Sequence, residues 1–154
     1  VHLPRDGLGF IAPEGFNTLH WYGRGPGESY CDRKLAAPVG KYSSSVEDTH
    51  FPFVPVSHNG SHADTRWFTL EDEDGSRITV KGSSFSFDVH HNTVEDYWNN
   101  YHEHELVRRD EVYINIDGAM AGIGGDMAWS TQLDPKHKVL ADKHQFEFLM
   151  SFSG

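Results

Sequence analysis

Several short segments of the sequence alternate between apolar and polar residues, and this alternation constrains the fold more than any other feature. In residues 84–90, SFSFDVH, the side chains of Phe85, Phe87 and Val89 fall on one side of an extended chain, with polar residues between them. A strand of this kind has one buried face and one solvated face. The same period of two predicts further strands, at residues 16–23, 66–71, 76–82, 111–117 and 146–152.

Only residues 92–106 favour a helix. Thr93 and Asp96 have the spacing of a capping box, which marks a helix start. The apolar side chains that follow fall at helical spacing on one face, namely Val94, Tyr97, Trp98 and Tyr101. We therefore expect a short amphipathic helix packed against a sheet.

Two shorter segments complete the expected fold. The acidic residues 71–75, EDEDG, predict a hairpin turn, and residues 28–37 suggest a further helical turn. No internal repeat or linker divides the sequence, so we expect one domain over residues 1–154. The summed prediction is an all-β sandwich with one short helix.

Charge and cysteine content limit the class of protein. A formal net charge of −10 argues against a nucleic-acid surface, which needs clustered lysine and arginine. Cys31 is the single cysteine, which excludes an internal disulfide framework and favours a cytoplasmic protein. No apolar stretch reaches the length of a membrane span. Val1 leads almost directly into a strand-like segment, so we expect a piece of a longer polypeptide.

Histidines and carboxylates are abundant, but their spacing matches no standard site. His90 and His91 are adjacent, and His102 and His104 are two apart, which suits no zinc signature. No nucleophile elbow, phosphate-binding loop or dinucleotide fingerprint occurs. The sequence therefore predicts neither a metal site nor a catalytic set within this chain.

Two glycine-rich segments carry aromatic residues, at residues 21–33 and 122–130. An aromatic ring beside carboxylates and amides is a common way to hold a sugar, because the CH face of a pyranose packs on the ring. For each aromatic residue taken alone, packing in the core is the simpler interpretation. Together the two segments favour a sugar contact.

The sequence resembles the C-terminal domain of LacZ-type β-galactosidases at four motifs. These are YGRGPGESYCDRK at residues 22–34, FPFVPVSHNGSHADTRW at 51–67, RRDEVYINIDGAMAGIGGDMAWS at 108–130, and the closing aromatic strand. The resemblance covers essentially the whole chain. It implies the galactose-mutarotase-like supersandwich of that family, of which this chain would be about the C-terminal half.

The resemblance also implies a function. LacZ-type enzymes hydrolyse terminal β-D-galactosides such as lactose with retention, using two glutamates on a TIM barrel. That barrel, with its magnesium and sodium sites, is not matched by any part of this chain. The chain is therefore expected to be non-catalytic alone and to need no cofactor in this segment. Its expected partners are a galactoside and the barrel of the same enzyme or of a large subunit, within a homo-oligomer.

The family motifs also indicate candidate site residues. Trp129 matches the tryptophan on which incoming substrate and leaving sugar stack, and the other candidate substrate-binding residues are Asp126, Glu28 and Tyr30. Asp32 and Arg33 match further positions of the motif. The chain departs from the family pattern at Ser29, Cys31, His58, Met127 and Ala128. The last two come directly before Trp129 and put the sugar preference of this position in question.

Three other functions remain open at this point. The chain could be a free-standing carbohydrate-binding module, which would bind galactose or lactose alone. It could be a sugar epimerase of the mutarotase type, although no pairing of a histidine with a glutamate is recognisable in the sequence. It could also have a purely structural role, completing a sandwich and a subunit interface.

Overall fold

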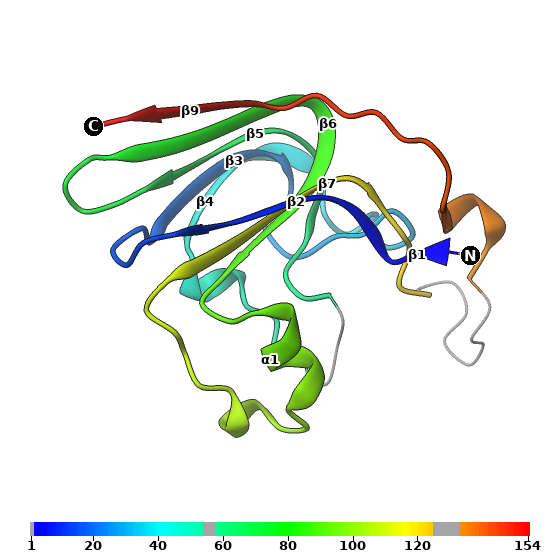
Figure 1. The fold of residues 1–154 in the computed structure, drawn as a ribbon, viewed down its shortest axis with the longest axis horizontal. Helices are drawn as coiled ribbons and strands as arrows, with labels where there is room; N and C mark the ends of the chain where they lie inside the picture. Colours follow the sequence, from blue (N-terminus) through cyan, green and yellow to red (C-terminus); the bar gives the residue numbers. More distant parts are fainter. Residues whose placement is uncertain (1, 54–57, 125–132) are drawn as a thin grey trace.

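A computed structural model describes residues 2–53, 58–124 and 133–154. Nearly all of the regular structure is β (Figure 1). The strands are β1 (His2–Leu3), β2 (Arg5–Ala12), β3 (Thr18–Arg24), β4 (Val39–Ser45), β5 (His62–Glu71), β6 (Arg77–His90), β7 (Val112–Met120), β8 (Val139–Leu140) and β9 (Leu149–Ser153). The helical elements are α1 (Val94–Asn99) and three 3-10 turns, η1 (Glu47–Thr49), η2 (Glu103–Glu105) and η3 (Pro135–His137).

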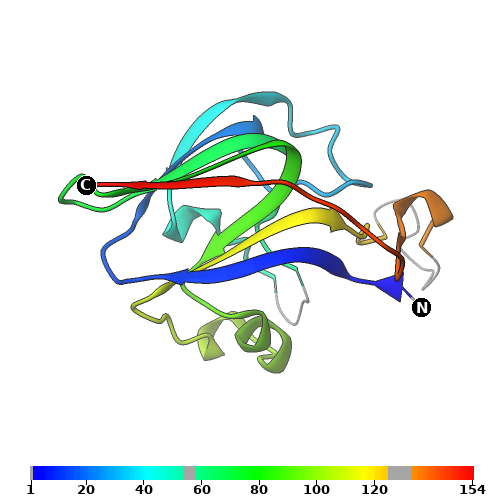
Figure 2. The same cartoon turned by 45° about the horizontal axis from the view of Figure 1, so that its top comes forward.

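The long strand β6 joins two layers of antiparallel strands. Its first part, residues 77–81, pairs with β9, and its last part, residues 86–90, pairs with β7. Strand β5 pairs with β6 along both parts, and the full strand order is β2-β7-β6-β5-β3-β4. In Figures 1 and 2, β6 bends between the layer that contains β9, β5, β3 and β4 and the layer that contains β2 and β7. The predicted all-β sandwich with one short helix is confirmed.

The core lies between the two layers. Phe85, Phe87 and Val89 on β6 are all buried, as their alternation predicts. Phe87 stacks on Phe68 of β5 with 4.5 Å between ring centroids. Trp21 of β3 packs edge-on against Phe87. Three neighbouring strands therefore contribute aromatic rings to one cluster, which fixes their register because a slip of one residue would turn these rings outward.

The predicted segments differ from the observed elements in three places. Residues 76–82 and 84–90 form one continuous strand, because Gly82 and the serines after it permit a bend without a turn. Strand β4, with its serine-rich sequence, was not predicted, since it has little apolar alternation. The predicted helical turn in residues 28–37 is wrong, because that segment forms non-helical turns.

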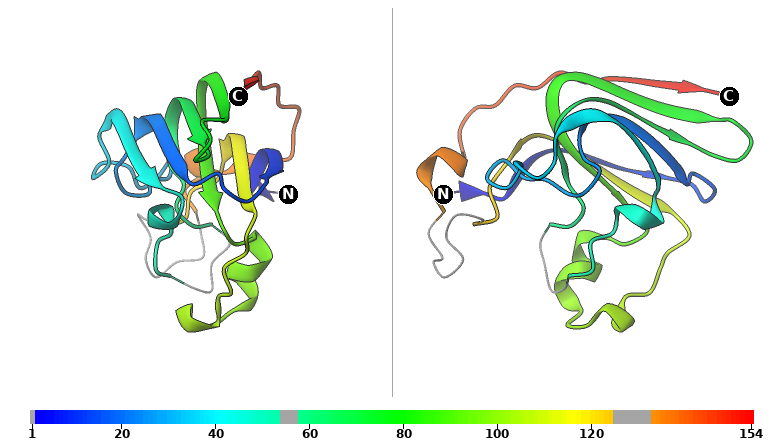
Figure 3. Two further views of the ribbon diagram at one scale, coloured as in Figure 1. Left: turned by 90° about the vertical axis from the view of Figure 1, so that its left-hand side faces the viewer. Right: turned by 180° about the vertical axis from the view of Figure 1, so that it is seen from behind.

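Helix α1 begins as predicted but is shorter than predicted. The Thr93 hydroxyl accepts from the Asp96 amide, and the Asp96 carboxylate accepts from the Thr93 amide. The helix ends at Asn99, and only part of the predicted apolar face is buried: Tyr97 is buried, whereas Trp98 is 61% exposed and Tyr101, beyond the helix, is 72% exposed. In Figure 3, α1 lies on the side of the molecule away from β9.

The strands β2, β7 and β6 are also joined by a buried ionic cluster on the face away from the aromatic core. Arg5 of β2 donates to both oxygens of Asp117 on β7, at 3.0 and 2.5 Å, and to Asp88 of β6 at 2.6 Å. Asn115 donates to the other oxygen of Asp88 at 2.7 Å. Each carboxylate is 3% exposed, so burial raises the pKa of Asp117, although Arg5 opposes that shift. One guanidinium therefore compensates two carboxylates that have lost most of their water.

A further surface feature is an open apolar groove between β2 and β9. Leu8 and Ile11 of β2 and Phe152 of β9 line a space of about 680 Å³, and all three residues are more than half exposed. Apolar surface of this extent usually marks a contact with other protein.

We expect Arg5→Met to lower the free energy of unfolding by about 3–5 kcal/mol, because it leaves two buried carboxylates uncompensated. The matched control is Arg77→Met, which removes an ion pair with Glu71 in which the arginine side chain is 55% exposed, and which we expect to cost less than about 1 kcal/mol. Urea denaturation followed by tryptophan fluorescence measures both values. Equal losses in the two variants would contradict the role assigned to Arg5.

Candidate functional site

The described part of the candidate site consists of two segments, residues 25–38 and residues 121–124. They carry Glu28 and Tyr30 and the beginning of the second glycine-rich motif. The other two candidate residues, Asp126 and Trp129, lie outside the described residues.

Residues 30–33 form a tight turn at the centre of the first segment. The amide of Tyr30 donates to the carbonyl of Arg33 at 3.0 Å, and the amide of Arg33 donates back to the carbonyl of Tyr30 at 3.0 Å. This pair of hydrogen bonds leaves Cys31 and Asp32 as the two central residues. The turn therefore presents the Asp32 side chain from a fixed backbone.

The Glu28 carboxylate holds this turn from one side. One oxygen accepts from the Tyr30 hydroxyl at 2.9 Å and from the Gly60 amide at 3.0 Å, and the other is paired with Arg33. The Glu28 side chain is 8% exposed and Tyr30 is 1% exposed. Both residues thus lie inside the protein, with Glu28 engaged by three internal partners.

The Tyr30 ring also lies within the field of the buried ionic cluster. Burial raises the pKa of the Tyr30 hydroxyl, the Asp88 carboxylate raises it further, and Arg5 lowers it. The hydroxyl is therefore neutral at physiological pH and donates its proton to Glu28.

Gly60 allows the close approach of the neighbouring segment. Its backbone has a φ of 60°, in the left-handed region that favours glycine, and a side chain there would meet the Thr49 carbonyl and the ring of His90. The preceding Asn59 is buried and exchanges two hydrogen bonds with the backbone of Phe51. This geometry brings the Gly60 amide within reach of Glu28.

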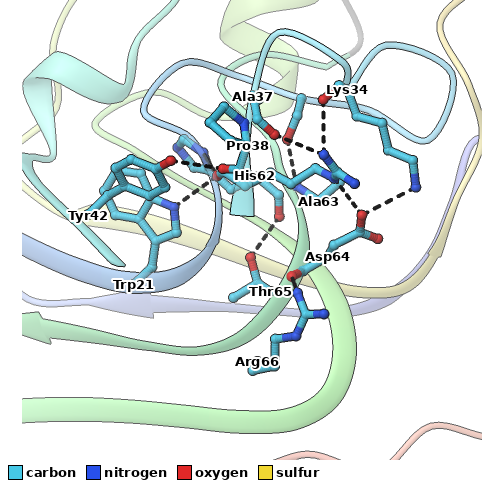
Figure 4. A network of polar contacts seen from close by, with 12 residues as sticks. Trp21, Lys34, Ala37, Pro38, Tyr42, His62, Ala63, Asp64, Thr65 and Arg66 are labelled. Carbon is cyan, nitrogen blue, oxygen red and sulfur yellow. Dashed lines mark hydrogen bonds and ion pairs between the residues drawn. The ribbon is translucent and has the colours of Figure 1, made fainter. Parts of the chain in front are cut away.

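A second network holds residues 25–38 from the other side (Figure 4). Arg24 donates through Nη1 to the carbonyls of Lys34 and Ala37, at 3.0 and 2.9 Å, and through Nε to Asp64 at 2.5 Å. Lys34 lies 3.2 Å from the same Asp64 oxygen. Because Asp64 and Arg24 belong to neighbouring strands, the sheet itself fixes both ends of this network, and Tyr42 adds a hydrogen bond to Pro38 at 2.8 Å.

Asp64 has an unusual backbone. It lies at an irregularity in the pairing of β5 with β6 and has a φ of 50°. Aspartate tolerates this left-handed conformation better than most residues. The bulge turns its carboxylate toward Arg24 and Lys34, which lower the pKa of Asp64 against the raising effect of its partial burial.

The second segment is held through four consecutive backbone amides. The amide of Ala121 donates to the Pro4 carbonyl and that of Gly122 to the His137 carbonyl, each at 2.9 Å. The next two amides, of Ile123 and Gly124, donate to the two carboxylate oxygens of Asp32, at 3.1 and 2.7 Å. Asp32 therefore joins the two segments of the site.

Buried histidines lie behind the first segment. His62 donates through Nδ1 to the carbonyl of Arg24 at 3.1 Å and packs on Trp21, with 4.5 Å between ring centroids. Burial lowers the pKa of His62 to about 4, and burial also lowers the pKa values of His58 and His90. These three rings are therefore neutral at physiological pH.

Sequence reasoning did not single out Asp32 as a contact to the glycine-rich motif, nor Gly60 as a partner of Glu28. The two halves of each contact are far apart in the chain, so no local spacing could reveal them. The family motif, which includes Asp32, was the available signal. Within residues 2–53, 58–124 and 133–154, no group of three or more His, Cys, Asp or Glu side chains is arranged to hold a metal ion.

Comparisons with known proteins give one consistent result. The family model described as beta galactosidase small chain matches residues 1–150. The chain is 34% identical to a beta-galactosidase from Vibrio cholerae over 148 residues and 33% identical to one from Streptococcus thermophilus over 152 residues. These matches cover 96% and 97% of this chain, but only 14% and 15% of the relatives' length. Among the described residues, no helix has the length and apolar character needed to cross a membrane.

We expect the free energy of unfolding to fall as the pH decreases from 7 toward 4. The folded-state pKa of His62, about 4, lies below its ordinary value of 6.5, so the unfolded chain binds more protons in this range. The stability contributed by neutral His62 is complete above about pH 6.5 and is lost progressively below it, by about 3 kcal/mol at pH 4.

His62→Asn keeps a donor at the position of Nδ1 but cannot take up a proton, so its stability should fall less steeply between pH 7 and 4. Urea denaturation at several pH values measures the slope. His104→Asn changes an exposed histidine and is the control. Parallel curves for the native chain and His62→Asn would contradict this assignment.

Proposed function

Since the chain belongs to the beta-galactosidase small chain family, we propose that it acts as a non-catalytic part of a retaining β-galactosidase. In this proposal it closes one side of the active site, and Trp129 provides the surface on which a galactoside such as lactose stacks. The two catalytic glutamates belong to the TIM-barrel portion, on the same polypeptide or on a large subunit. The magnesium and sodium sites belong to that portion as well.

The observation that supports this proposal is that the buried carboxylates are already bound by internal partners. Glu28 is occupied by Tyr30, Arg33 and the Gly60 amide, and Asp88 and Asp117 are occupied by Arg5. A general acid or nucleophile needs a carboxyl group with an oxygen directed at the substrate. These three carboxylates instead stabilise the scaffold, which favours a supporting role for the chain.

We propose that Glu28 and Tyr30 affect the substrate through the loop that they hold. Both are buried, so their effect on a sugar would pass through Asp32 and the glycine-rich motif. Trp129, and Asp126 beside the glycines, would make the direct contacts. An aromatic ring on a glycine-rich loop can approach a sugar closely because the neighbouring backbone has no side chains in the way.

The apolar groove between β2 and β9 supports a place within a larger assembly. Leu8, Ile11 and Phe152 would be covered by the remaining half of the supersandwich, since the related galactosidases are far longer than this chain. We propose that the complete enzyme is a homo-oligomer and is cytoplasmic, as the sequence predicts.

The alternative function is a free-standing carbohydrate-binding module, which would use the same tryptophan without a barrel. The epimerase alternative needs a histidine and a glutamate on opposite sides of a sugar ring. His50 and Glu103 lie in a small cavity of about 170 Å³, but they hydrogen bond to one another at 2.8 Å. Because these side chains are in direct contact, they leave no room between them for a sugar.

In the complete enzyme, we expect Trp129→Ala to raise KM for lactose about 2- to 13-fold, the range that one aromatic contact supplies. The same change should reduce transfer of galactose to an added acceptor sugar, while kcat for hydrolysis changes less. Trp98→Ala removes another exposed tryptophan, on α1, and should leave both values unchanged. An unaltered KM and acceptor profile in Trp129→Ala would exclude the stacking role.

The isolated chain should not hydrolyse a chromogenic galactoside, because the catalytic glutamates are expected elsewhere. Turnover by the purified chain at a rate near that of the enzyme would contradict this. Titration of the chain with galactose or lactose, followed by tryptophan fluorescence, separates the two leading functions. Binding in the millimolar range or tighter would favour the carbohydrate-binding module.

A further inference from the structure

We propose that the flap formed by residues 92–109 opens from the sheets at mildly acidic pH, because His90 beneath it can carry a charge only when the flap is open. The flap joins β6 to β7 and contains α1 and η2, and in Figure 1 it projects beyond the ends of these strands. The inference goes beyond the proposed function and does not depend on it, since it concerns residues outside the two glycine-rich segments.

Contacts between its two ends close the flap on itself. Asp96 accepts from Nε and Nη2 of Arg109 at 2.7 and 2.8 Å, and the side-chain amide of Asn92 donates to the Val107 carbonyl at 2.8 Å. The Arg109 backbone amide donates to the carbonyl of His91, just after β6, at 3.0 Å. Because these bonds keep the ends together, movement of the flap need not disturb the pairing of β6 with β7.

One buried residue docks the flap on the rest of the protein. All residues of the flap are described, and Tyr97 alone among them is buried. Its ring stacks on His50, with 5.6 Å between ring centroids, and meets the ring of His90 edge-on at 5.3 Å. Glu103 adds a hydrogen bond to His50 at 2.8 Å. Segments with few buried apolar contacts open at a low cost in free energy, so we expect the flap to open before the strands separate.

A polar cavity of about 170 Å³ leaves the contact between the flap and the sheets incomplete. Its lining includes His50, His90, Glu103 and Arg108. Arg108 is paired with Glu47 at 3.2 Å, but both side chains are more than half exposed, so this pair contributes little to closure. The cavity is polar and large enough to take up water, which can then reach the ring of His90 after a small movement of the flap.

His90 is suited to respond to pH because one of its ring nitrogens is unpaired while the flap is closed. Nε2 donates to the Asn59 carbonyl at 2.7 Å, whereas Nδ1 is buried and has no hydrogen-bond partner among the described residues. A proton on Nδ1 would place a donor and a positive charge where no acceptor is available. Gly60 covers the ring near Cε1, where a Cβ would lie only 2.6 Å away, and its amide is bonded to Glu28. The flap is therefore the cover of this ring that can move.

Charged and titratable groups of several elements surround His90. Asp88 on the same strand favours a charged ring, whereas Arg5 of β2 and His50 beside η1 disfavour it. His62 of β5 also interacts with His90. Burial is the largest effect, so the pKa of His90 lies below its ordinary value of 6.5. Opening of the flap restores about the ordinary pKa, so protons favour the open state and the flap opens as the pH falls below about 6.5.

The pair of His50 with Glu103 acts in the opposite direction. Nε2 of His50 donates to the Glu103 carboxylate, and Nδ1 lies 3.1 Å from the Tyr97 hydroxyl, which can either donate or accept. Both nitrogens of His50 thus have a partner in either protonation state, and a proton on this ring strengthens the closed state. The side chains of the pair are 27% and 43% exposed, so this effect is smaller than that of buried His90.

Hydrogen exchange of the full chain at pH 7 and pH 5, measured by mass spectrometry and corrected for the direct effect of pH on exchange, tests the inference. The amides of Tyr97 and Leu106 report opening, because they donate within α1 and η2, and helical segments this short do not persist without packing. We expect their protection to fall about 10- to 25-fold from pH 7 to pH 5, the range for a histidine that takes up its proton only in the open flap. Amides of β7 should remain about tenfold or more better protected at both pH values, which distinguishes opening of the flap from unfolding of the chain.

Two matched variants assign the response to His90. His90→Gln keeps a donor near the position of Nε2 but cannot take up a proton, so the fall in protection should shrink to less than about twofold. His104→Gln changes an exposed histidine of the same flap and should show the full fall. A full fall in His90→Gln, no fall in the native chain, or equal protection of the flap and β7 would each overturn the inference.

His50→Gln keeps the inference testable if His90→Gln fails to fold. This change removes the contact to Glu103 at a partly exposed position and leaves His90 in place. We expect lower protection of the flap at both pH values, with a fall from pH 7 to pH 5 at least as large as in the native chain. Loss of the fall in His50→Gln would assign the pH response to the pair of His50 with Glu103 and overturn the role of His90.

Discussion

The structure depends most on the contact of Arg5 with Asp88 and Asp117. The aromatic core alone does not fix β2, because the apolar residues of that strand partly face the open groove. Arg5 instead ties β2 to β7 and β6 on the polar face, where both carboxylates are buried. Removal of the guanidinium, or of the carboxylates, would leave the opposite charge buried without a partner. The cluster therefore adds side-chain contacts to the backbone pairing of β2 with β7 and of β7 with β6.

A second set of long-range contacts holds the candidate site. Tyr30 lies within the field of Asp88 and Arg5 and donates to Glu28, and Glu28 reaches Gly60 on the neighbouring segment. Each contact joins residues far apart in the sequence, so the turn that presents Asp32 is fixed by the whole fold. This explains why residues 25–38, with two glycines and two prolines, can serve as a rigid support.

The fold could be predicted from the sequence where burial alternates with exposure. Phe85, Phe87 and Val89 are buried as their period of two predicts, and the capping box at Thr93 is present. The spacing of apolar residues failed to predict burial where contacts between distant segments decide which side chains are covered. Trp98 has the spacing of an apolar helix face but is exposed, whereas Tyr97 beside it is buried against the rings of His50 and His90. The contact of Asp32 with Gly124 spans 92 residues, so local spacing could not predict it.

The departures from the family motif fall unevenly across the site. Asp32, Gly122 and Gly124, which form the anchoring contact, match the family pattern, whereas Met127 and Ala128, next to Trp129, do not. An anchor of buried, mutually dependent contacts tolerates little change, since each substitution leaves a polar partner unsatisfied or creates an overlap. Residues that touch a ligand can vary without that penalty. In the proposed function the chain therefore combines a support that matches the family motif with altered neighbours of Trp129, and any change in sugar preference would arise from those neighbours.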